Sequence, residues 1–128
     1  MRLLLDTHAL VWWVRNDDGL SKPASQAIAS AKSEVFVSVV VAWEIAIKVG
    51  LGKWPEAREL LDEFESTMTT NSFKLLPITI GHARVAGLMQ TQHRDPFDRL
   101  LVAQAQIEGL SLVTADGQLA DLGASILW

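Results

Sequence analysis

The sequence predicts an α/β fold in which a mostly parallel central sheet is covered by helices on both faces. Short apolar runs of strand length alternate with longer runs of helical length along the whole chain. This alternation is typical of parallel sheets with crossover helices. No internal repeat, low-complexity segment or linker interrupts it, so we expect a single domain over residues 1–128.

The composition limits the class of protein. Apolar residues make up 49% of the chain and charged residues 20%, which indicates a globular protein. The lack of cysteine excludes disulfides and thiolate metal sites and fits a reducing compartment. The longest apolar run, residues 9–14, is too short to span a membrane, and the N-terminal apolar run meets Asp6 too early for a signal peptide. We therefore expect a soluble cytoplasmic protein.

The net charge of −4 bears on possible partners. Counterion release requires Lys and Arg on the surface, so this charge argues against a simple basic nucleic-acid binder. An enzyme that reaches phosphate groups through bound cations stays compatible with it.

The first expected strand, residues 2–5, ends at Asp6, and an apolar run of helical length follows at residues 9–14. Asp6 would then lie at the carboxyl end of a strand, where open α/β sheets bind ligands. It could equally cap the following helix, a role that Thr7 could also fill.

Two features follow in the chain before the next strand. Trp12 and Trp13 are adjacent, so they cannot both face one core, and we expect one of them near the surface or beneath a partner. Residues 16–19 have the composition of a turn, and a helix is expected from Ser21 to about residue 33.

A second strand is expected at residues 35–37, and Ser38 could cap a helix over residues 39–49. This helix is apolar nearly all round and is therefore expected to be buried. Glu44 is its one acid. It could be a surface residue paired with Lys48 one turn later, but its apolar neighbours favour a functional carboxylate.

The middle of the chain carries little functional signal. Residues 55–68 predict one amphipathic helix whose acidic side is a solvated face. A short strand at residues 73–77 and a helix at residues 79–90 are expected next. His82 and His93 are interpreted as structural groups.

A helix that begins at Asp95 carries the most informative carboxylate. Asp95 suits the N-cap and Pro96 the first helical position. Counting by threes and fours from Asp98 reaches Leu101 and Val102, which form the apolar face. Asp98 should therefore point into the protein or a cleft, where an ionised acid needs a compensating charge. We assign Asp95 to the cap alone.

Two more strands are expected at residues 111–114 and 125–128, after Gly109 ends the long helix. Asp116 lies just past the first of these strands. Asp116 could also serve only as a turn residue before Gly117.

The expected topology places Asp6 and Asp116 at the carboxyl edge of the sheet, and Asp98 begins a helix that leads into one of its strands. Together with Glu44, these acids form the candidate set Asp6, Glu44, Asp98 and Asp116. Acids gathered without Cys or His repel one another unless a cation lies among them. Oxygen-only ligands select hard cations, so we expect Mg²⁺ or Mn²⁺. Such an ion orients water and stabilises charge on a phosphoryl oxygen.

Four motifs span almost the whole chain: LLLDTHAL at residues 3–10, WEIAIK at 43–48, HRDPFDRLL at 93–101 and TAD at 114–116. In order and spacing they resemble the PIN-domain family, particularly the bacterial VapC-type toxins. The resemblance implies a three-layer α/β/α sandwich and a Mg²⁺- or Mn²⁺-dependent endoribonuclease site. It also implies a cognate antitoxin and a homodimer.

The resemblance also implies residue roles. The catalytic and metal-binding set would be Asp6, Glu44, Asp98 and Asp116. Thr114 would assist a water at the metal, with Thr7 as a second supporting residue. Candidate RNA contacts are Lys48, Lys53, Arg94 and Arg99, all close in sequence to these acids.

Two other classes stay open. A receiver-like domain or Mg²⁺-dependent phosphohydrolase also places an Asp after its first strand, but it has a second acid beside the first, where this chain has Thr7 and His8. A non-catalytic PIN-fold interaction domain would keep the same acids. Ser or Cys nucleophile chemistry has no support, since the chain has no Cys and no G-x-S-x-G turn.

Overall fold

A sheet of five parallel strands organises the fold in the computed structural model, which describes residues 1–128. From one edge to the other, the strands are β3 (Lys74–Leu76), β2 (Glu34–Ser38), β1 (Arg2–Leu5), β4 (Ser111–Val113) and β5 (Ile126–Leu127). In this register Leu4 pairs with Phe36 on one side and with Leu112 on the other. Each strand reaches the next in sequence through a helical crossover, as parallel pairing requires. The predicted parallel sheet is confirmed and includes every strand.

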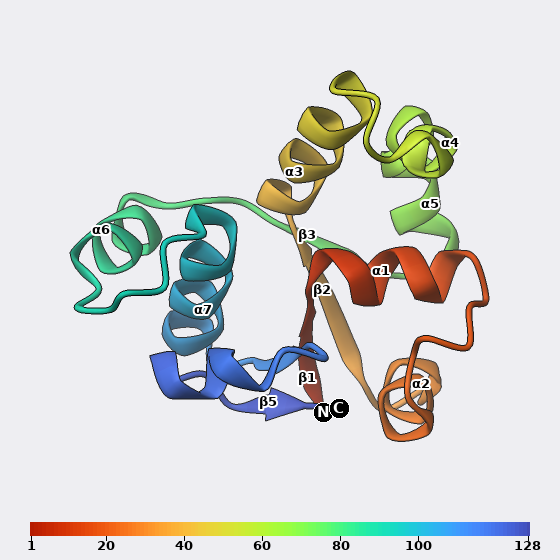
Figure 1. The fold of residues 1–128 in the computed structure, drawn as a ribbon. Coiled ribbons are helices and arrows are strands. Elements are labelled where there is room, and N and C mark those ends of the chain that lie inside the picture. Colours follow the sequence, from red (N-terminus) through yellow and green to blue (C-terminus); the bar gives the residue numbers. More distant parts are fainter.

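Helices cover both faces of this sheet and give a three-layer α/β/α sandwich (Figure 1). One side carries α1 (Thr7–Val14), α2 (Lys22–Ala29), η1 (Pro55–Ala57), α4 (Arg58–Asp62) and α5 (Phe64–Thr70). The other side carries α6 (Ile80–Leu88), α7 (Pro96–Glu108) and η2 (Gly117–Leu122). The long helix α3 (Val39–Gly50) rises from the end of β2 and contacts both α1 and α7. No helix is both long enough and apolar enough to cross a membrane.

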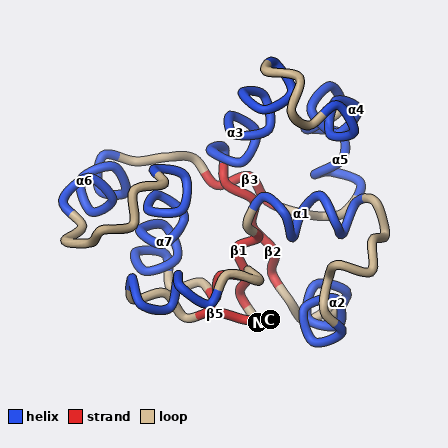
Figure 2. Tube along the Cα trace, viewed as in Figure 1, coloured by secondary structure: helices blue, strands red, loops and turns tan.

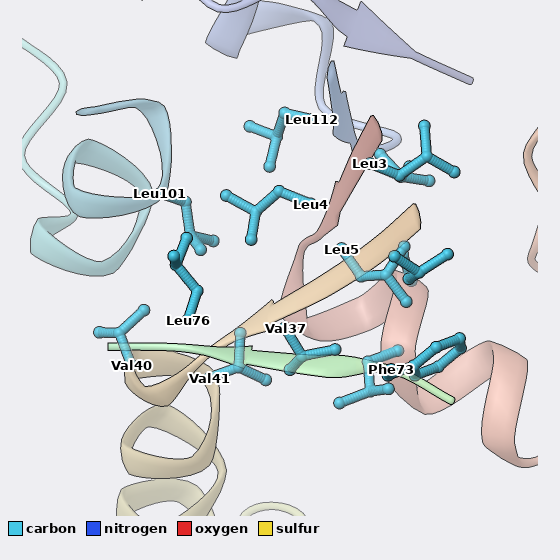
Figure 3. Close-up of a cluster of buried hydrophobic side chains, with 14 of the residues drawn as sticks. Leu3, Leu4, Leu5, Val37, Val40, Val41, Phe73, Leu76, Leu101 and Leu112 are labelled. Carbon is cyan, nitrogen blue, oxygen red and sulfur yellow. The ribbon is translucent and has the colours of Figure 1, made fainter. Parts of the chain in front are cut away.

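The core follows from the position of β1 in the middle of the sheet. Its three leucines are completely buried. Leu4 points to the face that α7 covers, near Leu101 and Leu112, whereas Leu3 and Leu5 point to the opposite face (Figure 3). Side chains alternate between the faces of a strand, so a strand covered on both faces needs an unbroken apolar run.

The ends of the helices agree well with the sequence. The Asp95 side chain accepts the backbone N–H groups of Phe97 and Asp98, and Gly109 ends α7 in the left-handed conformation with φ +67°. His82 is completely buried and exchanges hydrogen bonds with Thr79 in a capping box. The structural interpretation of His82 is therefore confirmed.

The single helix predicted over residues 55–68 is wrong. The chain forms η1, α4 and α5 there, and Figure 2 shows loop between the last two helices. Glu63 leaves the helical region with φ −112° and ψ 29°. Because Leu60 and Phe64 are buried on either side of the bend, two short helices satisfy the same apolar spacing as one straight helix.

The prediction that the helix over residues 39–49 is buried nearly all round is also wrong. Val40, Val41 and Ile45 of α3 are buried, but Trp43 on the other side is 59% exposed. The helix stands at the end of the sheet instead of lying flat on it, so neighbours cover only part of its circumference (Figure 1).

Candidate active site

A polar cavity of about 300 Å³ lies at the carboxyl end of the sheet. Only one of its ten lining residues, Leu101, is apolar. The cavity contains all four carboxylates predicted from the sequence, Asp6, Glu44, Asp98 and Asp116. They come from four separate segments: the end of β1, the middle of α3, the first turn of α7 and the turn after β4. The fold thus gathers acids that lie far apart in the chain.

Asp6 has both roles that the sequence left open, as a helix cap and as a lining residue of the cavity. Its Oδ1 accepts the backbone N–H of Ala9 at 2.8 Å and caps α1. Burial raises the pKa of the Asp6 carboxyl, although the Thr114 hydroxyl and the Ala9 N–H oppose that rise. The nearby Glu44 carboxylate raises the pKa further. The protein therefore holds Asp6 where a negative charge is poorly solvated.

Glu44 is only 8% exposed, yet its carboxylate is fully engaged. The Thr7 hydroxyl donates to Oε1 at 2.6 Å, and Lys48 Nζ lies 2.8 Å from Oε2. The sequence posed burial and pairing with Lys48 as alternatives, but both occur. The i, i+4 spacing brings the ammonium group over the carboxylate at the cavity wall.

Asp98 points into the cavity from the first turn of α7, as its helical position predicted. Its Oδ2 lies 2.9 Å from His93 Nε2. Burial raises the pKa of the Asp98 carboxyl, while the hydrogen bond with His93 opposes this rise. His93, interpreted from the sequence as a structural group, thus lies against one of the cavity carboxylates. The sequence offered one sign of this contact, because His93 and Asp98 belong to the same HRDPFD motif.

Three more polar residues of the cavity, Asp116, Thr114 and Asp95, belong to caps and turns. Asp116 accepts the N–H of Gln118 at 2.9 Å and begins η2, while its own N–H donates to the Thr114 hydroxyl at 3.1 Å. Asp116 therefore combines the turn role considered from the sequence with a place in the cavity. Thr114 is completely buried beneath it, and Asp95 also lines the cavity beside its α7 cap.

The four cations proposed for RNA contacts lie in different places. Lys48 lines the cavity, whereas Lys53 and Arg94 are exposed outside it. Arg99 donates to the carbonyl oxygens of Ala86, Gly87 and Met89 at 3.0–3.2 Å. Its guanidinium therefore stabilises the end of α6 and does not face the acids.

The sequence profile of the PIN domain matches residues 3–124. This chain belongs to the PIN-domain family. It is 30% identical over 124 residues to Ribonuclease VapC22 of Mycobacterium tuberculosis (strain ATCC 25618 / H37Rv), an alignment that covers 91% of this chain and 88% of that protein.

Solved structures share this PIN fold. VapBC2 from Rickettsia felis, bound to a DNA fragment from its promoter, gives a TM-score of 0.72 at 16% identity and covers 100% of this chain and 98% of that one. A toxin–antitoxin complex from Klebsiella pneumoniae gives 0.62 at 18% identity, with 98% and 96% covered. At such identities the likeness shows that the fold is the same.

The chemical type of the donor atoms in this cavity is suitable for a hard divalent cation. They are carboxylate oxygens, and burial raises the pKa of both Asp6 and Asp98, so a positive charge among them would be stabilised. No three His, Asp or Glu side chains are placed so that they could hold a metal ion as they stand. The protein instead engages the carboxylates with its own groups, notably Lys48 at Glu44 and His93 at Asp98.

Proposed function

We propose that this PIN-domain protein is an endoribonuclease that requires Mg²⁺ or Mn²⁺ and acts in the cytoplasm as the toxin of a toxin–antitoxin pair. The observation that carries the proposal is the cavity itself, which gathers the four predicted carboxylates, together with Asp95, from four segments at the carboxyl edge of a parallel sheet. The 30% identity to a protein named a ribonuclease supports the same activity.

The side chains of the cavity divide into three roles. Asp6, Glu44, Asp98 and Asp116 would hold the cation. A bound Mg²⁺ or Mn²⁺ supplies a more acidic water and neutralises charge on a phosphoryl oxygen. The Thr7 hydroxyl orients Glu44 through its 2.6 Å hydrogen bond, and Thr114 offers a buried hydroxyl beside Asp6. Lys48 provides a positive charge at the cavity wall for a substrate phosphate.

Cleavage of a single-stranded RNA by Asp98→Asn and Asp95→Asn tests the division of roles. In Mn²⁺ we expect Asp98→Asn to fall to the rate seen in EDTA, because Asn keeps the shape of the side chain but cannot supply a charge to a cation. Asp95→Asn should keep most of the activity, since Asn caps a helix as well as Asp does. Wild-type rates in Asp98→Asn, or an equal collapse of both variants, would contradict this assignment.

A non-catalytic PIN-fold interaction domain is the second candidate. Protein groups already engage the carboxylates, and no three of them form a ready metal site. The same assay separates the two functions. RNA that stays intact with wild-type protein in Mn²⁺ would favour the interaction domain.

We further propose a cognate antitoxin and a homodimer. The support for an antitoxin is that solved toxin–antitoxin complexes share this fold. The support for a second copy is an apolar face of α3 that this chain leaves uncovered, formed by Val39, Trp43 and Ile47 at successive four-residue steps.

A further inference from the structure

We propose that a row of aromatic side chains beside the acid cavity stacks the bases of single-stranded RNA and thereby selects unpaired substrate. This aromatic row consists of Trp54, His8, Trp12 and Trp128. The inference rests on the proposed ribonuclease function. It adds to that function the path of the strand and the reason why the strand must be unpaired.

The four rings of the aromatic row follow one another at regular distances. The ring centroids are 5.2 Å apart between Trp54 and His8, 5.5 Å between His8 and Trp12, and 5.7 Å between Trp12 and Trp128. The residues come from three distant parts of the sequence: α1, the segment after α3 and the C-terminal end. The tertiary fold therefore builds a continuous aromatic surface.

This surface begins at the candidate active site. His8 is exposed and lines the acid cavity together with Asp6. Trp128 follows β5 at the same edge of the sheet, where the Thr114 N–H donates to the Leu127 carbonyl. All three tryptophans of the row keep part of their surface exposed. A strand that enters the cavity would therefore meet the exposed His8 ring first and then the exposed parts of the tryptophan rings.

The charges around the aromatic row favour a polyanion at one end. Lys48 Nζ lies 5.4 Å from the centroid of the Trp54 ring, and Lys53 precedes Trp54 in the chain. At the other end, the hollow beside Trp12 is lined by two acids, Asp17 and Asp18, and one cation, Lys22, so it offers no net positive charge to a phosphate. We therefore expect the strongest stacking at Trp54 and His8.

Aromatic rings interleaved with cations are a general way to bind single-stranded nucleic acid. Every base offers a π face, so stacking tolerates many sequences. In a duplex these faces are already covered by neighbouring bases and are not accessible to a protein ring. The aromatic row should therefore discriminate between unpaired and paired RNA without reading base identity.

The first test measures binding separately from cleavage. The anisotropy of a labelled oligoribonucleotide is followed in EDTA for a single strand, for the same strand in a duplex, and for the strand with abasic positions. We expect the duplex and the abasic strand to bind about tenfold more weakly than the single strand, in line with the cost of losing one stacked base. Equal affinity for all three, or no binding of the single strand, would overturn the proposal.

Substitutions at His8 separate stacking from charge. His8→Ala removes the ring and should weaken single-strand binding about tenfold. His8→Phe keeps a flat ring and should retain the affinity, whereas His8→Lys introduces a cation without a ring and should bind as weakly as His8→Ala. Since His8 is exposed, these variants should fold normally, and their melting temperatures check this.

Trp54 provides an independent pair of variants, Trp54→Ala and Trp54→Phe, with the ring again retained in the second. Wild-type affinity in Trp54→Ala and His8→Ala would show that the rings only pack together or serve a protein partner. Wild-type affinity in His8→Lys would show attraction by charge. A protein that binds single strands through these rings but cleaves none in Mn²⁺ would leave the aromatic row in place and remove the ribonuclease function.

Discussion

At the scale of single residues, the acid cavity places charged groups where the fold solvates them poorly. Burial is the largest cause that raises the pKa of both Asp6 and Asp98, and Glu44 adds a like charge to each. A carboxyl whose pKa is higher in the folded state binds its proton more tightly there than in the unfolded chain. The free energy of unfolding therefore falls as the pH rises from the unfolded pKa through the folded one, and the whole cost is present above the folded pKa.

Asp98→Asn should relieve this cost. In EDTA at neutral pH we expect the variant to melt at or above the wild-type temperature, because one poorly solvated charge is gone. The difference should shrink as the pH falls and Asp98 of the wild type becomes protonated. Thermal melts across this acid range provide the measurement. A variant that is less stable than wild type in EDTA would show that the bond to His93 outweighs burial and repulsion at Asp98.

The same pair of proteins tests the cation. Mn²⁺ at about 100 times its dissociation constant adds roughly 2.7 kcal/mol to a protein that binds it only when folded. For a domain of this size, the melting temperature should rise on the order of 10 °C. Asp98→Asn should gain much less. A wild-type melt that Mn²⁺ leaves unchanged would argue against a metal site in the cavity.

At the scale of elements, the turn after α1 closes over the first tryptophan of the WW pair. Gly19 lies so close to Trp12 that a Cβ atom there would be 2.8 Å from Cε2 of the indole. The Trp13 Nε1–H donates to Asn71 at 3.0 Å on the side of α5. Both tryptophans are partly buried, so adjacent rings that cannot share one face are covered by two different neighbours.

Gly19→Ala should therefore destabilise the protein. The added methyl group must displace the Trp12 ring, and such overpacking costs about 1–3 kcal/mol. We expect the melting temperature to fall by roughly 4–12 °C. Gly50→Ala is the matched control, because nothing lies within 4 Å of its added Cβ at the end of α3. That control should gain about 0.4–1 kcal/mol. Equal melting temperatures in the two variants would show that the close packing of Gly19 against the Trp12 ring does not matter for stability.

At the scale of the whole molecule, the sandwich leaves one helix face unpaired. Val39, Trp43 and Ile47 of α3 are 44%, 59% and 38% exposed, although the opposite side of this helix is buried. Trp43 contacts Phe97 edge-on, with 5.3 Å between the ring centroids, and so extends the apolar surface onto α7. Exposed apolar faces of this kind are typical of protein interfaces, which is the basis of the homodimer proposed above.

We expect the protein to be a dimer in solution through this face. Light scattering after size-exclusion chromatography should give about twice the 14.1 kDa of one chain. Trp43→Lys places a charge at the centre of the face and should shift the mass toward the monomer, whereas Lys32→Ala on a distant exposed turn should not. A monomeric wild type would contradict the homodimer and leave this face to another partner, such as the antitoxin.

The local features of the fold could be predicted from the sequence alone. The strand at residues 2–5, the cap at Asp95 and the helix end at Gly109 were predicted correctly. Each depends on a few neighbouring residues, whose side chains either satisfy the backbone locally or alternate between two faces. The shared edge of Asp6 and Asp116 followed from the same logic, because parallel strands all end on the same side.

Contacts between distant segments were decided only by the tertiary structure. The bend at Glu63 and the exposed side of α3 depend on what packs against each helix, and an apolar pattern does not specify this. The hydrogen bond between His93 and Asp98 depends on how a loop comes to lie beside α7. The hydrogen bonds from Arg99 to backbone carbonyls of α6 depend on how the end of α6 packs against α7. Hydrophobic periodicity determines which face of an element is buried, but the side chains that meet across two elements are selected by distances of a few ångströms that exist only once the elements have packed.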